Sequence, residues 1–329
     1  ETPAPTTPAP GAAETARQDA VADALAIAEL ATAAAADPGS AALAERPELA
    51  EVLLAVAATS SRHAEELGGV YTPWTATPTP APDTSTSSPT TSAPTPGAQD
   101  VIDALEQARQ RAADDADEAE DGGFARLLAS IAASRSVLAA DLEARLAGTT
   151  LALPTTEEAT SGTSADAGPT SSGVQDSALL GLVEAHDALG AAWEVLAARA
   201  EDDERARAAL VASEHRSTAQ ALAAALGAAG TDLDPRRTAY ALPAELLDPE
   251  GDALAGLLPL ETRLGVRLAG LVAQADPGSR AALVSALEEN AHLLLVLTGA
   301  PQALPGVDED AAPDATSDQP ADAGTTTSP

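Results

Sequence analysis

Composition and charge restrict the classes of protein to which this chain of 329 residues can belong. The formal net charge is −34, and all 17 basic residues are arginine. This charge repels a phosphate backbone, so it excludes nucleic acid as a partner, and it disfavours an anionic membrane surface. The absence of cysteine excludes disulfides and thiolate chemistry.

The apolar residues of the chain predict an all-α fold. Alanine, leucine and valine supply most of them, whereas the aromatic residues are one Phe, two Trp and two Tyr. Such side chains favour close-packed helices, and no alternating run of Val, Ile or Tyr is long enough for a strand. The longest strongly apolar run, residues 293–297, is far too short to span a bilayer, so we expect no transmembrane segment.

Four low-complexity tracts interrupt the helical pattern. Rich in Pro, Thr, Ser, Gly and Asp, they bury too little apolar surface to offset the entropy of ordering, and we expect disorder. Such tracts are typical of stalks in exported proteins, with a plain flexible linker as the equal alternative. The chain has no methionine, so we expect an exported protein that has lost a leader before Glu1, or else a truncated sequence. The tracts are residues 1–13, 71–97, 149–176 and the acidic tail 299–329.

The first helical block, residues 14–148, is predicted to contain four helices. Pro38 ends the first of them, and Pro47 occupies a favourable first-turn position in the second. The long tract 71–97 separates the second helix from the third, and Gly122 and Gly123 separate the third from the fourth. The helices are expected at residues 14–36, 47–67, 98–120 and 124–146.

The second block, residues 177–298, repeats this plan. Its apolar residues recur at steps of three and four, as on the face of a helix. A long connection, residues 229–251, lies between the second and third helices and contains the run AYALP at 239–243. The helices are expected at residues 177–200, 202–226, 252–275 and 279–298.

Both blocks therefore have two helix–turn–helix pairs around one long connection. This is the connectivity of ferritin-like four-helix bundles, so we predict two such bundles joined by disordered linkers. The repeated plan also predicts an ancient duplication. RHAEEL (62–67) lies in the second helix of the first block, where EHRSTA (214–219) lies in the second block.

Ionisable side chains on the inward faces of the second block form a candidate metal site. A buried charge must be paired or must bind a cation, and imidazoles with carboxylates are ligands for iron, manganese or zinc. His186 falls on the apolar face of its helix between Leu182 and Leu189. The candidate ligands are His186, His215, Glu261, Glu288, Glu289 and His292.

The ligand pattern of a di-iron bundle is only partly present. That pattern requires Glu-x-x-His on two helices, and only Glu289 and His292 have this spacing. Glu214 directly precedes His215, and adjacent residues do not share a helix face. The alternative is that the histidines are core residues bonded to neighbours and that the glutamates are solvated charges. No glycine-rich phosphate loop or nucleophile elbow indicates a catalytic or organic-cofactor site.

Four runs in the second block resemble DUF4439, a ferritin-like domain family of unknown function found mostly in actinobacteria. These runs are AHDALGAAWEVLAAR (185–199), EHR with a following AL (214–222), AYALP (239–243) and LE (260–261). The resemblance covers residues 178–298 and implies a ferritin-like bundle with no defined activity. It also implies an exported or lipoprotein-like chain, consistent with a lipid anchor upstream of Glu1.

We therefore expect an exported or envelope-tethered protein that acts as a non-catalytic binding or structural module. The alternative is a metal-dependent oxidoreductase or metal-storage protein that uses His186, His215, Glu261 and His292. A third arrangement is a homodimer in which the first block is a degenerate scaffold.

Overall fold

The computed structural model describes residues 10–37, 39–70, 96–155 and 171–307. Over these ranges the protein has ten helices and no strand, which confirms the predicted all-α fold. The predicted tract 71–97 lies almost wholly outside the described residues, as do residues 1–9, 156–170 and 308–329. The first half contains α1 (Ala12–Ala35), α2 (Ala41–Glu45), α3 (Glu48–Glu66), α4 (Ala98–Glu118) and α5 (Gly122–Leu146). The second half contains α7 (Asp176–Arg199), α8 (Asp202–Ala225), α9 (Ala244–Leu247), α10 (Ala253–Gln274) and α11 (Ala281–Thr298).

Local chemistry explains where the helices begin and end. The carboxylate of Asp121 accepts a hydrogen bond from the Phe124 amide (2.7 Å) and caps α5, and Asp252 caps α10 in the same way. At the other end of α5 and of α11, a glycine adopts the left-handed conformation that stops a helix. These residues are Gly148 (φ 75°) and Gly299 (φ 70°).

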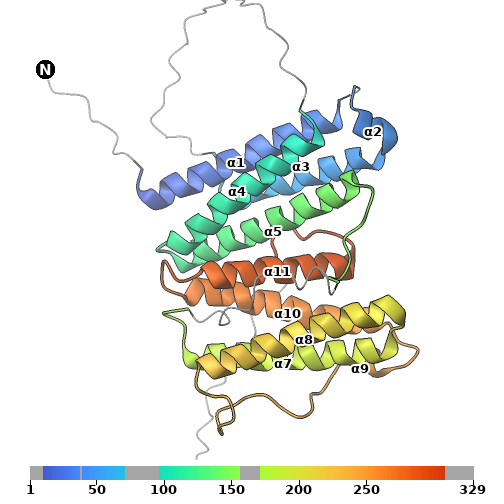
Figure 1. Ribbon diagram of the computed structural model, residues 1–329. Helices are drawn as coiled ribbons and strands as arrows, with labels where there is room; N and C mark the ends of the chain where they lie inside the picture. Colours follow the sequence, from blue (N-terminus) through green and yellow to red (C-terminus); the bar gives the residue numbers. More distant parts are fainter. Residues whose placement is uncertain (1–9, 38, 71–95, 156–170, 308–329) are drawn as a thin grey trace, which may run out of the picture.

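The long helices form four hairpins that stack in layers (Figure 1). In order, the layers are α1 with α3, α4 with α5, α11 with α10, and α8 with α7. Within the first half α1 packs on α4 and α3 on α5, and within the second half α7 packs on α10. The halves meet in the middle of the stack, where α5 contacts both α10 and α11.

Two clusters of buried apolar side chains fill the interior. The larger one extends through both halves and includes Leu128 and Ile131 of α5 together with Leu264 and Leu268 of α10. The smaller one lies within the first half, around Ile27, Leu49, Leu53, Leu105 and Leu142. The predicted linker therefore separates the two halves along the chain, while in space they share one apolar cluster.

Parts of the low-complexity tracts pack against the helices. Residues 300–307 continue from α11, and Leu304, Pro305 and Gly306 are buried. Leu151 and Leu153, which follow α5, pack against the larger apolar cluster. Both segments were predicted to be disordered from their composition, which does not show that a few leucines pack against the helices. The ordered chain thus continues several residues past α5 and past α11.

Two helices of the described chain, α5 and α11, are long and apolar enough to cross a membrane by length and composition. They lie next to each other in the middle of the stack, and most of the apolar window of α5 is buried there. A core helix passes the same test, so these helices give no clear transmembrane segment.

Candidate functional site

A buried carboxylate connects four helices of the second half. Glu261 of α10 is fully buried, and its Oε1 accepts hydrogen bonds from Trp193 Nε1 of α7 (2.7 Å) and His215 Nε2 of α8 (3.1 Å). Its Oε2 accepts a hydrogen bond from Asn290 Nδ2 of α11 (2.9 Å). Because an ionised carboxylate can only accept, all three nitrogens donate to it. We call Glu261, Trp193, His215, Asn290 and His186 the buried network.

The two histidines of the buried network contact each other through their Nδ1 atoms, which lie 3.0 Å apart. Since His215 uses Nε2–H toward Glu261, a neutral His215 ring accepts at Nδ1 and His186 donates. This leaves His186 Nε2 as a buried lone pair without a hydrogen-bond partner. Burial, and secondarily the neighbouring His215, lowers the pKa of His186 to about 3. His186 is therefore neutral at physiological pH.

Two glycines leave room for polar side chains within and beside the buried network. Gly265 lies one turn after Glu261 on α10, and a Cβ at Gly265 would lie 2.5 Å from Asn290 Oδ1. On α7, Gly190 lies between His186 and Trp193, and a Cβ there would lie 2.7 Å from the Cδ atom of Arg216. Both distances are shorter than real Cβ contacts, so either substitution would displace a polar side chain.

A second group of hydrogen bonds attaches the 229–251 connection to α7 and α8. Asp187 Oδ1 accepts from Arg216 Nη1 (2.6 Å), and Asp187 Oδ2 accepts from the Tyr240 hydroxyl (2.5 Å). Arg216 also makes two hydrogen bonds to the carboxylate of Glu194, at 3.0 and 2.9 Å. Burial and the hydrogen bond to Asp187 raise the pKa of Tyr240 to about 12, so the hydroxyl remains a donor.

Apart from Asn290, the residues of these two groups lie in the runs that carry the family resemblance. Residues 178–309 match the family model described as a domain of unknown function, DUF4439. This segment is a DUF4439 domain. No curated protein and no solved structure matches the chain. The matched range extends beyond the predicted 178–298 and includes the packed residues 300–307.

Only half of the predicted ligands in the DUF4439 domain converge. His186, His215 and Glu261 meet in the buried network. Glu288 instead forms a salt bridge with Arg109 of α4 (3.2 Å), and His292 Nε2 hydrogen-bonds to the Ser136 hydroxyl of α5 (2.8 Å). These last two pairs join the DUF4439 domain to the first half.

The sixth predicted ligand, Glu289, has an exposed side chain. Within the described residues, no group of three or more His, Asp or Glu side chains is placed to hold a metal ion. Trp193 and Asn290 were not predicted as site residues. Asn290 has a signal that could have identified it, because it interrupts the apolar face formed by Leu283, Leu287 and Leu294.

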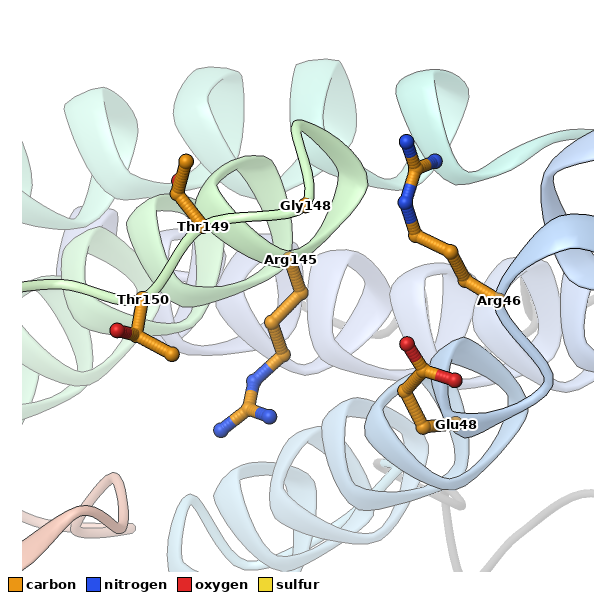
Figure 2. Close-up of a pocket in the computed structure, with 6 residues that line it drawn as sticks. All are labelled: Arg46, Glu48, Arg145, Gly148, Thr149 and Thr150. Atoms are coloured by element: carbon orange, nitrogen blue, oxygen red, sulfur yellow. The ribbon is translucent and has the colours of Figure 1, made fainter.

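An open cleft of about 470 Å³ lies in the first half, at the C-terminal end of α5. Figure 2 shows that the guanidinium groups of Arg46 and Arg145 point in different directions. Arg145 is also paired with Asp141 at 2.9 Å. The charges do not converge, so the cleft carries no argument for a binding site. Its lining residues are Arg46, Glu48, Arg145, Gly148, Thr149 and Thr150.

Replacing Asp187 with alanine should loosen the 229–251 connection, because Arg216 and Tyr240 would both lose their shared acceptor. Hydrogen bonds to charged groups contribute about 1.5–3 kcal/mol, so amide exchange in the connection should accelerate about 10–100-fold. Glu184→Ala is the matched control, since Glu184 forms a more exposed salt bridge with Arg237 in the same connection. Hydrogen–deuterium exchange would measure both variants, and equal exchange rates in the two would contradict the role given to Asp187.

Proposed function

We propose that the DUF4439 domain is a ferritin-like helical module with a structural or binding role, in an exported or envelope-tethered protein. The ferritin-like assignment rests on its connectivity, two helical hairpins separated by the long 229–251 connection. The Thr/Ser/Pro-rich tracts 71–97 and 149–176 support a location outside the cytoplasm.

The observation that carries the non-catalytic role is that the buried Glu261 carboxylate is satisfied by donors of the protein itself. In a ferritin-like bundle, inward-facing histidines and carboxylates at this place would hold metal ions. Here the Glu261 carboxylate accepts from Trp193, His215 and Asn290, and His215 uses both ring nitrogens. Three donors are enough to stabilise a buried carboxylate without a cation. The network thus fastens four helices together at one point.

A second candidate function, metal binding, is favoured by one observation on the histidine pair. Two imidazole Nδ1 atoms lie 3.0 Å apart, and His186 Nε2 is buried without a partner. Neutral imidazoles are ligands for iron, manganese and zinc. A cation bound at the Nδ1 pair would require the proton on His186 Nδ1 to move to Nε2, the buried nitrogen that has no partner.

Elemental analysis of protein purified without chelator distinguishes the two functions. The structural role predicts substoichiometric iron, manganese and zinc, and no change in thermal stability on adding each metal. Stoichiometric metal that disappears in a His186→Ala, His215→Ala double variant would overturn the proposal. His292→Ala is the matched control, because His292 bonds to Ser136 outside the buried network.

The location is tested separately by fractionating cells that produce the protein. The proposal expects the protein in the medium or the cell envelope. Recovery only from the cytoplasm would overturn the exported location and would leave the structural role to be decided by the metal analysis.

A further inference from the structure

The same short sequence follows the last helix of each half. Gly148 after α5 and Gly299 after α11 both adopt the left-handed conformation, and Ala-Leu-Pro begins four residues later in each case. The two copies are residues 152–154 and 303–305. We call residues 149–155 the first strap and residues 300–307 the second strap.

Each strap crosses to the opposite half of the molecule. In the second strap, the carbonyl of Ala303 accepts a hydrogen bond from His63 Nε2 of α3 (2.8 Å), and that of Gly306 accepts from Arg126 Nη2 of α5 (2.9 Å). In the first strap, the carbonyl of Leu153 accepts from Arg207 Nη1 of α8 (3.2 Å). The helices α3 and α8 are each the second long helix of their half. Each strap therefore contacts the equivalent helix of the other half, although the exact contacts differ.

The second strap is embedded in the DUF4439 domain as well. Gly306 has a φ of 74°, and a Cβ at this position would lie 2.6 Å from the carbonyl oxygen of Gly265 and 2.7 Å from Ala269 Cβ. Only glycine fits so close to α10. This strap therefore bridges α10 on one side and α3 and α5 on the other.

Equivalent turns of the two halves also meet. Arg280, in the turn between α10 and α11, is buried and donates to the carbonyls of Ala116 (3.0 Å) and Ala119 at the α4–α5 turn. The Gly278 amide donates to the carbonyl of Asp117 (2.7 Å), in the last turn of α4. Each of these turns joins the third long helix of its half to the fourth.

The order of the layers has the symmetry of a dimer. Figure 1 shows the outer hairpins α1/α3 and α7/α8 on either side of the inner hairpins α4/α5 and α10/α11. At the centre, α5 contacts α11, and the flanking contacts are α5 with α10 and α4 with α11. The fourth long helices of the two halves contact each other, and each also contacts the third long helix of the opposite half. A self-complementary interface related by a two-fold axis has this pattern.

We propose that the face formed by α10, α11 and the second strap is a homotypic interaction surface, whose partner is a second copy of the same helical repeat. In this chain the first half supplies that copy, so the protein is an internal dimer. The proposal is independent of the metal question. It requires that the face can also pair with another DUF4439 domain when the first half is removed from it.

The test uses the full chain with a protease recognition sequence inserted between residues 163 and 164. After cleavage, native mass spectrometry should find the two halves as one complex. After the cut protein is heated and cooled, a dimer of second halves should be present beside that complex. Separation of the halves on cleavage, or second halves that are only monomeric after heating, would overturn the proposal.

A variant of the contact between the turns strengthens this test. Arg280→Ala in the cut chain should raise the dissociation constant of the two halves about tenfold or more, because several buried carbonyls lose their donor. Arg263→Ala, which removes an exposed arginine from α10, is the matched control and should leave the constant unchanged. Circular dichroism confirms that each variant is folded, and equal constants for a folded Arg280→Ala variant and the control would overturn the proposal.

Discussion

Glu261→Ala is expected to lower the free energy of unfolding by about 3–5 kcal/mol. The variant would leave Trp193, His215 and Asn290 without their shared acceptor inside the protein. Buried donors without acceptors cost more than the net contribution of the hydrogen bonds themselves. Chemical denaturation, monitored by circular dichroism, measures the loss.

Two further variants show whether the loss comes from unpaired polar groups. Arg263→Ala on the same helix removes an exposed side chain and should change stability by less than about 0.5 kcal/mol. Combining Glu261→Leu with His215→Leu replaces the buried pair by apolar groups and should recover part of the stability lost by either change alone. Strictly additive losses would show that the two side chains act independently.

Acid is expected to destabilise the protein through its buried histidines. Burial lowers the pKa of His63 to about 4 and that of His186 to about 3, whereas an unfolded histidine titrates near 6.5. Between those values the unfolded chain binds more protons than the folded chain. The stability that depends on these neutral histidines is therefore complete above pH 6.5. As the pH decreases below 6.5, the free energy of unfolding decreases by up to about 1.4 kcal/mol per pH unit for each histidine.

His63→Gln isolates one of these contributions. The glutamine amide can still donate to the carbonyl of Ala303, but it does not titrate in this range. Unfolding free energies measured at pH 7 and pH 5 should differ by about 2 kcal/mol less in the variant than in the unmodified protein. His186→Asn should show a similar reduction. An unchanged pH dependence in both variants would mean that the pKa of each histidine is the same in the folded and the unfolded chain, which contradicts the prediction.

Helix positions could be predicted from the sequence because capping and stop signals are local. The α7 helix was predicted at 177–200 and is observed at Asp176–Arg199, and proline and glycine residues mark most of the other ends. The short helix α2 was not predicted. It has only five residues and starts at a Ser40 cap, which is too brief a segment to show a periodic pattern.

The inward positions of His186, His215 and Glu261 could also be predicted, because each falls in an apolar row of a helix with one buried face. The directions of Glu288 and His292 could not. Because α11 packs between α10 and α5, residues on more than one face of α11 contact other helices. Periodicity within one helix does not distinguish a neighbour in the same half from one in the other half. The signal available in the sequence was that apolar residues lie on nearly every side of α5, as in a helix at the centre of a protein.

The part of the chain that shares one apolar cluster is larger than the segment that matches the family. The matched segment begins at residue 178, yet its helices α10 and α11 are covered by α5, which belongs to the other half of the chain. A fragment cut at the family boundary would expose that apolar surface to water, at a cost of about 25 cal/mol for each Å². A family match marks a segment that was inherited as one piece, whereas the buried apolar surface determines which segments depend on each other to fold.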